Sequence, residues 1–213
     1  MRLVVLSDTH LRHDFAVPDG DVLIHCGDAT TSGSAEQLKR FGSWVSSLPH
    51  RHKIVIAGNH DFALSRFPFL AKRYLRGTTY LCDSQTTLGG ISFYGSPWQP
   101  EFNNWAFNLP RGPALARKWE MIPSGTDVLI THGPPFGILD VSLSGEHVGC
   151  EDLSRRIRAV RPRVHVFGHI HECHGAEVID GTLYVNASIC DDGNRVRYAP
   201  YVIDIDGSRV GFG

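Results

Sequence analysis

The stretch Val164-His165-Val166-Phe167-Gly168-His169-Ile170-His171 ends an apolar, β-branched run in a glycine and then places two histidines one residue apart. Such a run is typical of a buried strand, and the glycine indicates a turn at its end. Because side chains alternate along an extended chain, we expect both histidines to face one pocket at the strand tip. A lone histidine pair is weak evidence for a metal site, so the other strand ends decide its meaning.

Four earlier apolar runs end in a similar way. They are short and continuous rather than alternating, which predicts strands buried on both faces; they cover residues 3–6, 22–26, 54–57 and 128–131. Potential metal ligands follow them in turn: Asp8 and His10, then Asp28, then Asn59 beside His60, then His132. Sites in α/β sheets lie at the carboxyl ends of strands, so we expect these side chains to converge.

The segments between these strands predict the fold class. Helical patterns cover residues 34–48, 67–75, 113–121 and 151–160, with Ser34 as a candidate N-cap of the first. Residues 79–94 and 176–212 contain short strand-like pieces, and Asp180-Gly181 predicts a hairpin turn. We therefore expect one α/β domain over residues 1–213, built as a four-layer αββα sandwich of two mixed β-sheets flanked by helices.

Composition and charge narrow the classes of function. With 42% apolar and 20% charged residues, the chain has ordinary globular usage. A net charge of −1 gives no electrostatic surface for nucleic acid, and no stretch is long enough to span a bilayer. The five scattered cysteines form no CxxC pair, and no signal peptide is evident, so we expect a reduced, cytoplasmic protein. We expect its partner to be a small-molecule substrate. The oligomeric state is left open.

The donor atoms of the candidate ligands indicate which metal ions the site would bind, and how many. Three are oxygen donors and four are imidazoles: Asp8, Asp28 and Asn59, then His10, His132, His169 and His171. This mixture suits Mn, Fe, Zn, Ni or Co and fits Ca poorly. Seven ligands exceed the three or four that one zinc ion uses, so two ions sharing a carboxylate are expected. Paired ions clamp a phosphate and activate water, which is the chemistry of phosphoester hydrolysis.

These motifs resemble, in order, the five motifs of the calcineurin-like metallophosphoesterases. They are Asp8-x-His10, Gly27-Asp28, Gly58-Asn59-His60-Asp61, Thr131-His132-Gly133 and Gly168-His169-Ile170-His171. A finer resemblance, to the metallophosphoesterase-domain-containing (MPPED) group, is carried by Gly95-Ser96-Pro97-Trp98 and by residues 107–112, 131–135 and 165–172. Some members of that group lack one ligand histidine, whereas this sequence keeps both.

The resemblance implies roles for these residues. Asp8, His10 and His171 would hold a first metal, Asn59, His132 and His169 a second, and Asp28 would bridge the two. His60 would protonate the leaving oxygen, with Asp61 as an orienting carboxylate. Metal hydroxide would attack phosphorus in line, without a covalent enzyme intermediate. Mn²⁺ is the leading ion, with Fe, Ni, Zn, Co or Mg as alternatives.

The resemblance also implies phosphodiester hydrolysis, with small phosphodiesters such as cyclic nucleotides or aryl phosphodiesters as the leading expected substrates. A phosphomonoesterase or nuclease on the same centre is the alternative enzyme, and a non-catalytic binding scaffold is the alternative from another class. An intact ligand set favours an enzyme over a scaffold.

Substrate contacts are less defined by the sequence. His13 and His174 each lie three residues after a predicted ligand and could face the pocket, and Asn103 and Arg111 are further candidates. The aromatic segment 96–111 could stack on a base or aryl group through Trp98, Trp105 and Phe107, as could Phe136, but a hydrophobic cap on the sheet is slightly favoured. His25 and His165 lie inside apolar runs and are predicted to be packed and hydrogen-bonded.

Overall fold

Strand β1 (Arg2–Leu6) lies inside a six-stranded sheet in the computed structural model, which describes residues 1–213. The strand order is β14-β13-β1-β2-β3-β4. The strands that run parallel to β1 are β2 (Val22–His25), β3 (His52–Val55) and β4 (Thr79–Tyr80). The hairpin of β13 (Tyr201–Asp206) and β14 (Arg209–Phe212) adds antiparallel strands at one edge.

A second six-stranded sheet has the order β11-β12-β10-β9-β6-β5. Its parallel strands are β6 (Ile91–Ser96), β9 (Val128–Thr131), β10 (Val164–Phe167) and β12 (Thr182–Asn186). Its antiparallel edges are β5 (Ser84–Leu88) and β11 (Gly175–Ile179), the latter joined to β12 through the predicted turn at Asp180-Gly181. Both sheets are therefore mixed, as predicted.

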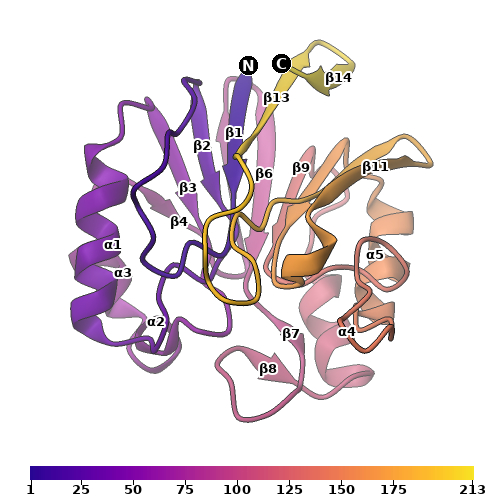
Figure 1. Cartoon of the computed structure of the whole chain (residues 1–213). Helices are drawn as coiled ribbons and strands as arrows, with labels where there is room; N and C mark the ends of the chain where they lie inside the picture. Colours follow the sequence, from indigo (N-terminus) through magenta and orange to yellow (C-terminus); the bar gives the residue numbers. More distant parts are fainter.

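Helices cover the outer faces of the two sheets (Figure 1). The first sheet carries α1 (Ala35–Ser47), α2 (Phe62–Arg66) and α3 (Phe69–Tyr74). The second carries α4 (Pro113–Glu120) and α5 (Glu151–Val160). Ser34 accepts the backbone N–H of Gln37, as expected of an N-cap. The short helix α2 was not predicted. None of the helices combines the length and the apolar character that a membrane-spanning helix needs.

The four layers explain why the apolar runs are continuous. In β1, Leu3 and Val5 pack into the cluster between the sheets, while Val4 and Leu6 pack into the cluster beneath the helices. All four side chains are fully buried. A strand that is covered on both faces must be apolar at every position, which confirms the predicted αββα sandwich.

The two sheets are joined where the strands end. Beyond β1, Ser7 forms a parallel bridge with Ser188, which lies just beyond β12. The Ser7 N–H donates to Ala187 at 2.8 Å, and the Ser7 carbonyl accepts the N–H of Ile189 at 3.1 Å. Loops from both sheets therefore meet at one edge of the sandwich, and this edge carries the predicted site.

Candidate metal centre

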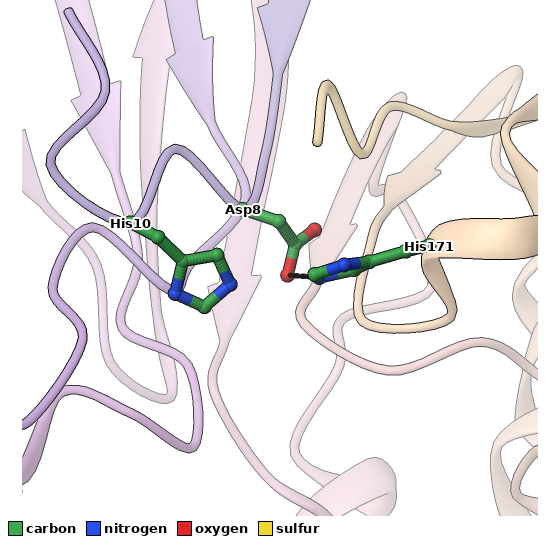
Figure 2. A group of neighbouring side chains, drawn as sticks. All are labelled: Asp8, His10 and His171. Atoms are coloured by element: carbon green, nitrogen blue, oxygen red, sulfur yellow. Dashed lines mark ion pairs between the residues drawn. The ribbon is translucent and has the colours of Figure 1, made fainter. Parts of the chain in front are cut away.

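The seven predicted ligands come together at this edge from five loops. They follow β1, β2, β3, β9 and β10, so the sandwich places them by topology. The ligand atoms of Asp8, His10 and His171 all lie within 4.8 Å of one another. Figure 2 shows Asp8 between the two imidazoles, which approach it from opposite sides.

A second group contains Asp28, His132 and His169, with the same spacing of ligand atoms. The Asn59 Oδ1 atom joins this group, because it lies 2.8 Å from His132 Nε2. Asp28 also groups with His10 and His60. Its Oδ2 atom is 3.4 Å from His132 Nε2 and 4.0 Å from His10 Nε2, so this carboxylate lies between the two groups.

The two histidines of the opening stretch reach different groups, but not by strand alternation. Strand β10 ends at Phe167, before either histidine. His169 has a left-handed backbone with φ of 73°, and His171 begins the 3₁₀ helix η1 (His171–Cys173). Both side chains line one cavity, as expected, but the prediction of an extended strand tip that places them there is wrong. A turn separates the two side chains, and it sends His171 towards Asp8 and His169 towards Asp28.

Two buried polar atoms show that the site fits metal ions. Asp8 Oδ1 and His10 Nε2 are shielded from solvent and have no hydrogen-bond partner, and the nearest opposite charge to Asp8 Oδ1 is His171 Nε2 at 3.4 Å. The other oxygen of Asp8, Oδ2, accepts the Ser188 hydroxyl at 2.6 Å and the His169 N–H at 3.0 Å. Buried polar groups without partners are costly, and a cation at this position would satisfy both atoms. The mixed oxygen and imidazole donors suit a borderline divalent ion.

Backbone carbonyls orient three of the four imidazoles. The Nδ1 atoms of His10, His132 and His171 lie 3.1, 3.0 and 3.1 Å from the carbonyl oxygens of Thr30, Cys26 and Asp191. A carbonyl only accepts, so each Nδ1 carries the hydrogen and each Nε2 faces the site. This arrangement is typical of histidines that bind a metal through Nε2.

Without metal ions, each ligand group contains a carboxylate next to a histidine: Asp8 beside His171, and Asp28 beside His132. Burial disfavours a charge on His171, but the nearby Asp8 carboxylate outweighs it and raises the pKa of His171 to about 9. His132 shows the same balance against Asp28, with its pKa raised to about 9. Burial lowers the pKa of His10, and lowers that of His169 to about 3. The site therefore holds two protonated and two neutral imidazoles around two carboxylates.

Local backbone strain accompanies the ligands. Asp8, His10, Asp28 and His169 all have positive φ values between 43° and 73°. Such conformations are uncommon outside glycine and cluster at functional sites. Gly168 permits the close approach of the β10 loop to β1, because a Cβ there would overlap the Asp8 carboxylate and the Ser7 side chain. The sequence motif needs glycine at this position for that reason.

His60 lies at the site, and Asp61 does not orient it. His60 Nδ1 donates to the Thr31 carbonyl at 2.6 Å, and Nε2 lies 3.9 Å from Asp28 Oδ2. The buried Asp61 carboxylate instead accepts the N–H groups of Thr30 and Gly58 at 3.0 and 2.8 Å. Asp61 thus holds two ligand loops together, and the expectation that it positions the His60 imidazole is wrong.

A cavity of about 400 Å³ opens over the ligands. Trp105 lines it with its ring 4.1 Å from that of His60, and Phe102 lines it with its ring 5.3 Å from that of His169. Trp98 and Phe107 pack beneath instead, with Trp98 Nε1 bonded to Asp83. The aromatic segment, which contains the short parallel strands β7 (Gln99–Pro100) and β8 (Asn108–Leu109), is therefore part cavity wall and part cap.

The structure does not bring the predicted substrate contacts to this cavity. His13 stacks on Trp44 of α1, and burial lowers its pKa to about 4. His174 stacks between Tyr198 and Tyr201. Each imidazole is held by aromatic packing, so the three-residue spacing from a ligand gave a wrong expectation.

Asn103 and Phe136 also lie outside the residues that line this cavity. Arg111 borders a neighbouring cavity instead. His25 and His165 are buried and bonded to Thr9 and Thr131, as predicted.

Sequence reasoning missed Ser188, Glu172, Asp192, Asn194 and Leu143. Ser188 fixes the orientation of Asp8, and the other four line the cavity. Ser188 follows strand β12 without a metal-type motif, so only its position at another strand end could have indicated it.

Comparison with known proteins agrees with this geometry. A profile of the calcineurin-like phosphoesterase family matches residues 1–173. Metallophosphoesterase domain-containing protein 1 of Homo sapiens is 45% identical over 98% of this chain and 72% of its own length, and the Mus musculus protein of that name gives the same values.

A solved structure described as a novel archaeal phosphodiesterase shares the fold, with a TM-score of 0.52 and 18% identity over 99% of this chain and 98% of that one. Another solved structure superimposes with a TM-score of 0.71 and 18% identity over 87% of this chain and 89% of that one. The chain therefore belongs to the calcineurin-like phosphoesterase family, within its group of metallophosphoesterase-domain-containing proteins.

Proposed function

We propose that this chain hydrolyses small phosphodiesters. The observation that carries the proposal is the charge of the cavity: neither lysine nor arginine is among its 13 lining residues, while Glu172 and Asp192 are. A phosphomonoester carries about −1.5 to −2 charges near neutral pH, whereas a diester carries one. Beyond the proposed metal ligands and their ions, the cavity has no lysine or arginine to meet a second negative charge, which favours the diester over the monoester.

The cavity also favours a small organic substrate over a polymer. Its walls include the exposed apolar side chains Phe102 and Leu143, and the chain carries a net charge of only −1. A nucleic acid would call for a basic surface along its backbone. A nuclease is therefore the weaker alternative.

The proposed metal ligands form two sets that share Asp28. Asp8, His10 and His171 would hold one divalent ion, Asn59, His132 and His169 another, and Asp28 would contact both. Two ions in such a site clamp the phosphate, withdraw charge from its oxygens and lower the pKa of water towards neutrality. The mixed imidazole and oxygen donors suit Mn, Fe, Ni, Zn or Co; we take Mn²⁺ as the leading ion, with the others and Mg as alternatives.

His60 is the proposed acid. Its Nδ1 hydrogen is committed to the Thr31 carbonyl, so a proton on Nε2 is the one available to the cavity. Transfer of that proton to the leaving oxygen would neutralise the alcoholate as the ester bond breaks. The ring of Trp105 packs against the imidazole and would keep it facing the phosphate.

A substrate panel tests the proposal. The purified protein is assayed with Mn, Fe, Ni, Mg and Zn against matched mono- and diesters that share one chromogenic leaving group, with cyclic nucleotides in parallel. We expect a higher kcat/KM for the diester. Faster monoester hydrolysis would support the phosphomonoesterase instead, and no hydrolysis with any ion would favour a binding scaffold.

A further inference from the structure

A second cavity of about 270 Å³ lies beside the predicted metal centre. It shares three lining residues with the larger cavity: Phe102, His169 and Ile170. Phe102 is 40% exposed, and its ring meets that of His169 edge-on at 5.3 Å. The two cavities therefore adjoin along a thin wall that includes a predicted metal ligand.

The walls of the second cavity are held in place from within the fold. On one side, Asp140 is fully buried and accepts the N–H groups of Gly137 and Gly149 at 2.9 and 3.0 Å. Arg111 donates to the carbonyl oxygens of Val148 and Gly149 at 2.8 and 2.7 Å. These bonds fix the residue 137–149 segment, so the cavity is preformed and a ligand need not order it.

The second cavity suits an uncharged, mainly apolar group. Pro100, Pro134 and Val148 contribute to its lining, and the acidic Glu101, which also lines it, disfavours an anionic group. The charge of Arg111, its basic member, is matched by Glu151 at a distance of 2.6 Å. A cavity of about 150 Å³ is enough for one benzene ring, so this one has room for an aryl group.

We propose that the second cavity is a subsite for the non-leaving ester group of the substrate, and that this group is aryl or similarly apolar. The inference rests on the proposed function. A phosphate at the metal centre would lie next to His169, and one of its two ester groups would pass Phe102 into the subsite. Arg111 is a positioning residue, because it holds the wall and does not meet the phosphate.

A binding experiment tests the subsite without relying on turnover. Isothermal titration calorimetry of the metal-loaded protein compares diphenyl phosphate with methyl phenyl phosphate, which differ in one ester group alone. We expect the diphenyl ester to bind at least about 10-fold more tightly, because a ring leaves water. Equal affinities, or no binding of either ester, would overturn the subsite.

Variants that fill the second cavity test whether the preference for the diphenyl ester arises there. Val148→Phe fills the second cavity, and we expect it to reduce the preference to within about 2-fold. Val141→Phe is the matched control, since Val141 belongs to the same segment but lines neither cavity, and it should keep the preference. Ser142→Phe fills the cavity from a partly exposed position if Val148→Phe does not fold. A preference that survives both filling variants would overturn the subsite.

Kinetics then separate this inference from the function on which it rests. Methyl and phenyl p-nitrophenyl phosphate release the same product and differ only in the non-leaving group. Hydrolysis of both by the wild type with no preference for the phenyl ester would refute the subsite and keep the diesterase. Selective binding without hydrolysis would refute the diesterase and keep the subsite.

Discussion

Ser188→Ala removes the hydroxyl that fixes Asp8. The Ser188 Oγ atom is 2.6 Å from Asp8 Oδ2, and both residues are fully buried. This bond directs the Oδ1 atom, which has no hydrogen-bond partner, towards His10 and His171, and Oδ1 lies 3.4 Å from His171 Nε2. In the variant, the Oδ2 atom keeps only the N–H of His169, so the carboxylate is free to rotate.

The magnitude follows from the type of bond. A hydrogen bond to a charged group contributes about 1.5–3 kcal/mol. For a chain of this size, that loss lowers the Tm of the metal-free protein by about 3–12 °C. Groups that orient metal ligands typically contribute about 10–100-fold to affinity, and we expect the affinity for one of the two ions to fall by that factor.

Differential scanning calorimetry of the metal-free protein and calorimetric titration with Mn²⁺ measure the two effects. Ser7→Ala is the matched control, because Ser7 is equally buried and faces Ser188 across the bridge between the sheets. Its Oγ makes only a 3.4 Å contact with the Gly27 carbonyl, so the control should lose less stability and no metal affinity. Unchanged affinity and Tm in Ser188→Ala would refute the positioning of Asp8 by Ser188.

Four further predictions concern the ionisable groups of the site. Asp28→Ala should abolish hydrolysis and weaken both ions, and metal analysis that shows two tightly held ions would remove Asp28 from its bridging role. His60→Ala should keep both ions but slow turnover by about 10²–10⁴-fold, whereas loss of metal would make His60 a ligand. Metal binding near neutral pH should release protons, because the pKa values of His132 and His171 are raised to about 9 without ions. The stability that these protonated histidines give the metal-free protein is complete below their unfolded pKa of about 6.5 and is lost as the pH rises through about 9, which denaturation at a series of pH values measures.

The sequence predicts the strands and their polar ends well, because burial on both faces requires an apolar side chain at every strand position. A strand covered on both faces has no position for a polar residue until it ends, so the first Asp or His after residues 3–6 marks the edge of the sheet. The order of such ends is sufficient to predict two packed sheets and the seven ligands. The helices over the sheets follow from amphipathic spacing in the same way.

What the sequence cannot give is the path of the loops beyond those ends. Spacing suggested that His13 and His174 follow the ligands into the cavity, but local turns carry them onto aromatic side chains instead. Asp61 follows His60 directly, yet its carboxylate faces the neighbouring loop at Thr30. Ser188 comes from a strand with no ligand motif. Each of these contacts depends on tertiary packing between segments far apart in the chain.

The two groups of candidate ligands are proposed to hold two divalent ions around Asp28. The most direct measurement is the number of ions bound per chain, determined by elemental analysis and by titration of the metal-free protein to saturation. We expect two ions per chain, and we expect His171→Ala and His132→Ala each to lose one. Saturation of the wild type at a single ion would rule out a dinuclear centre.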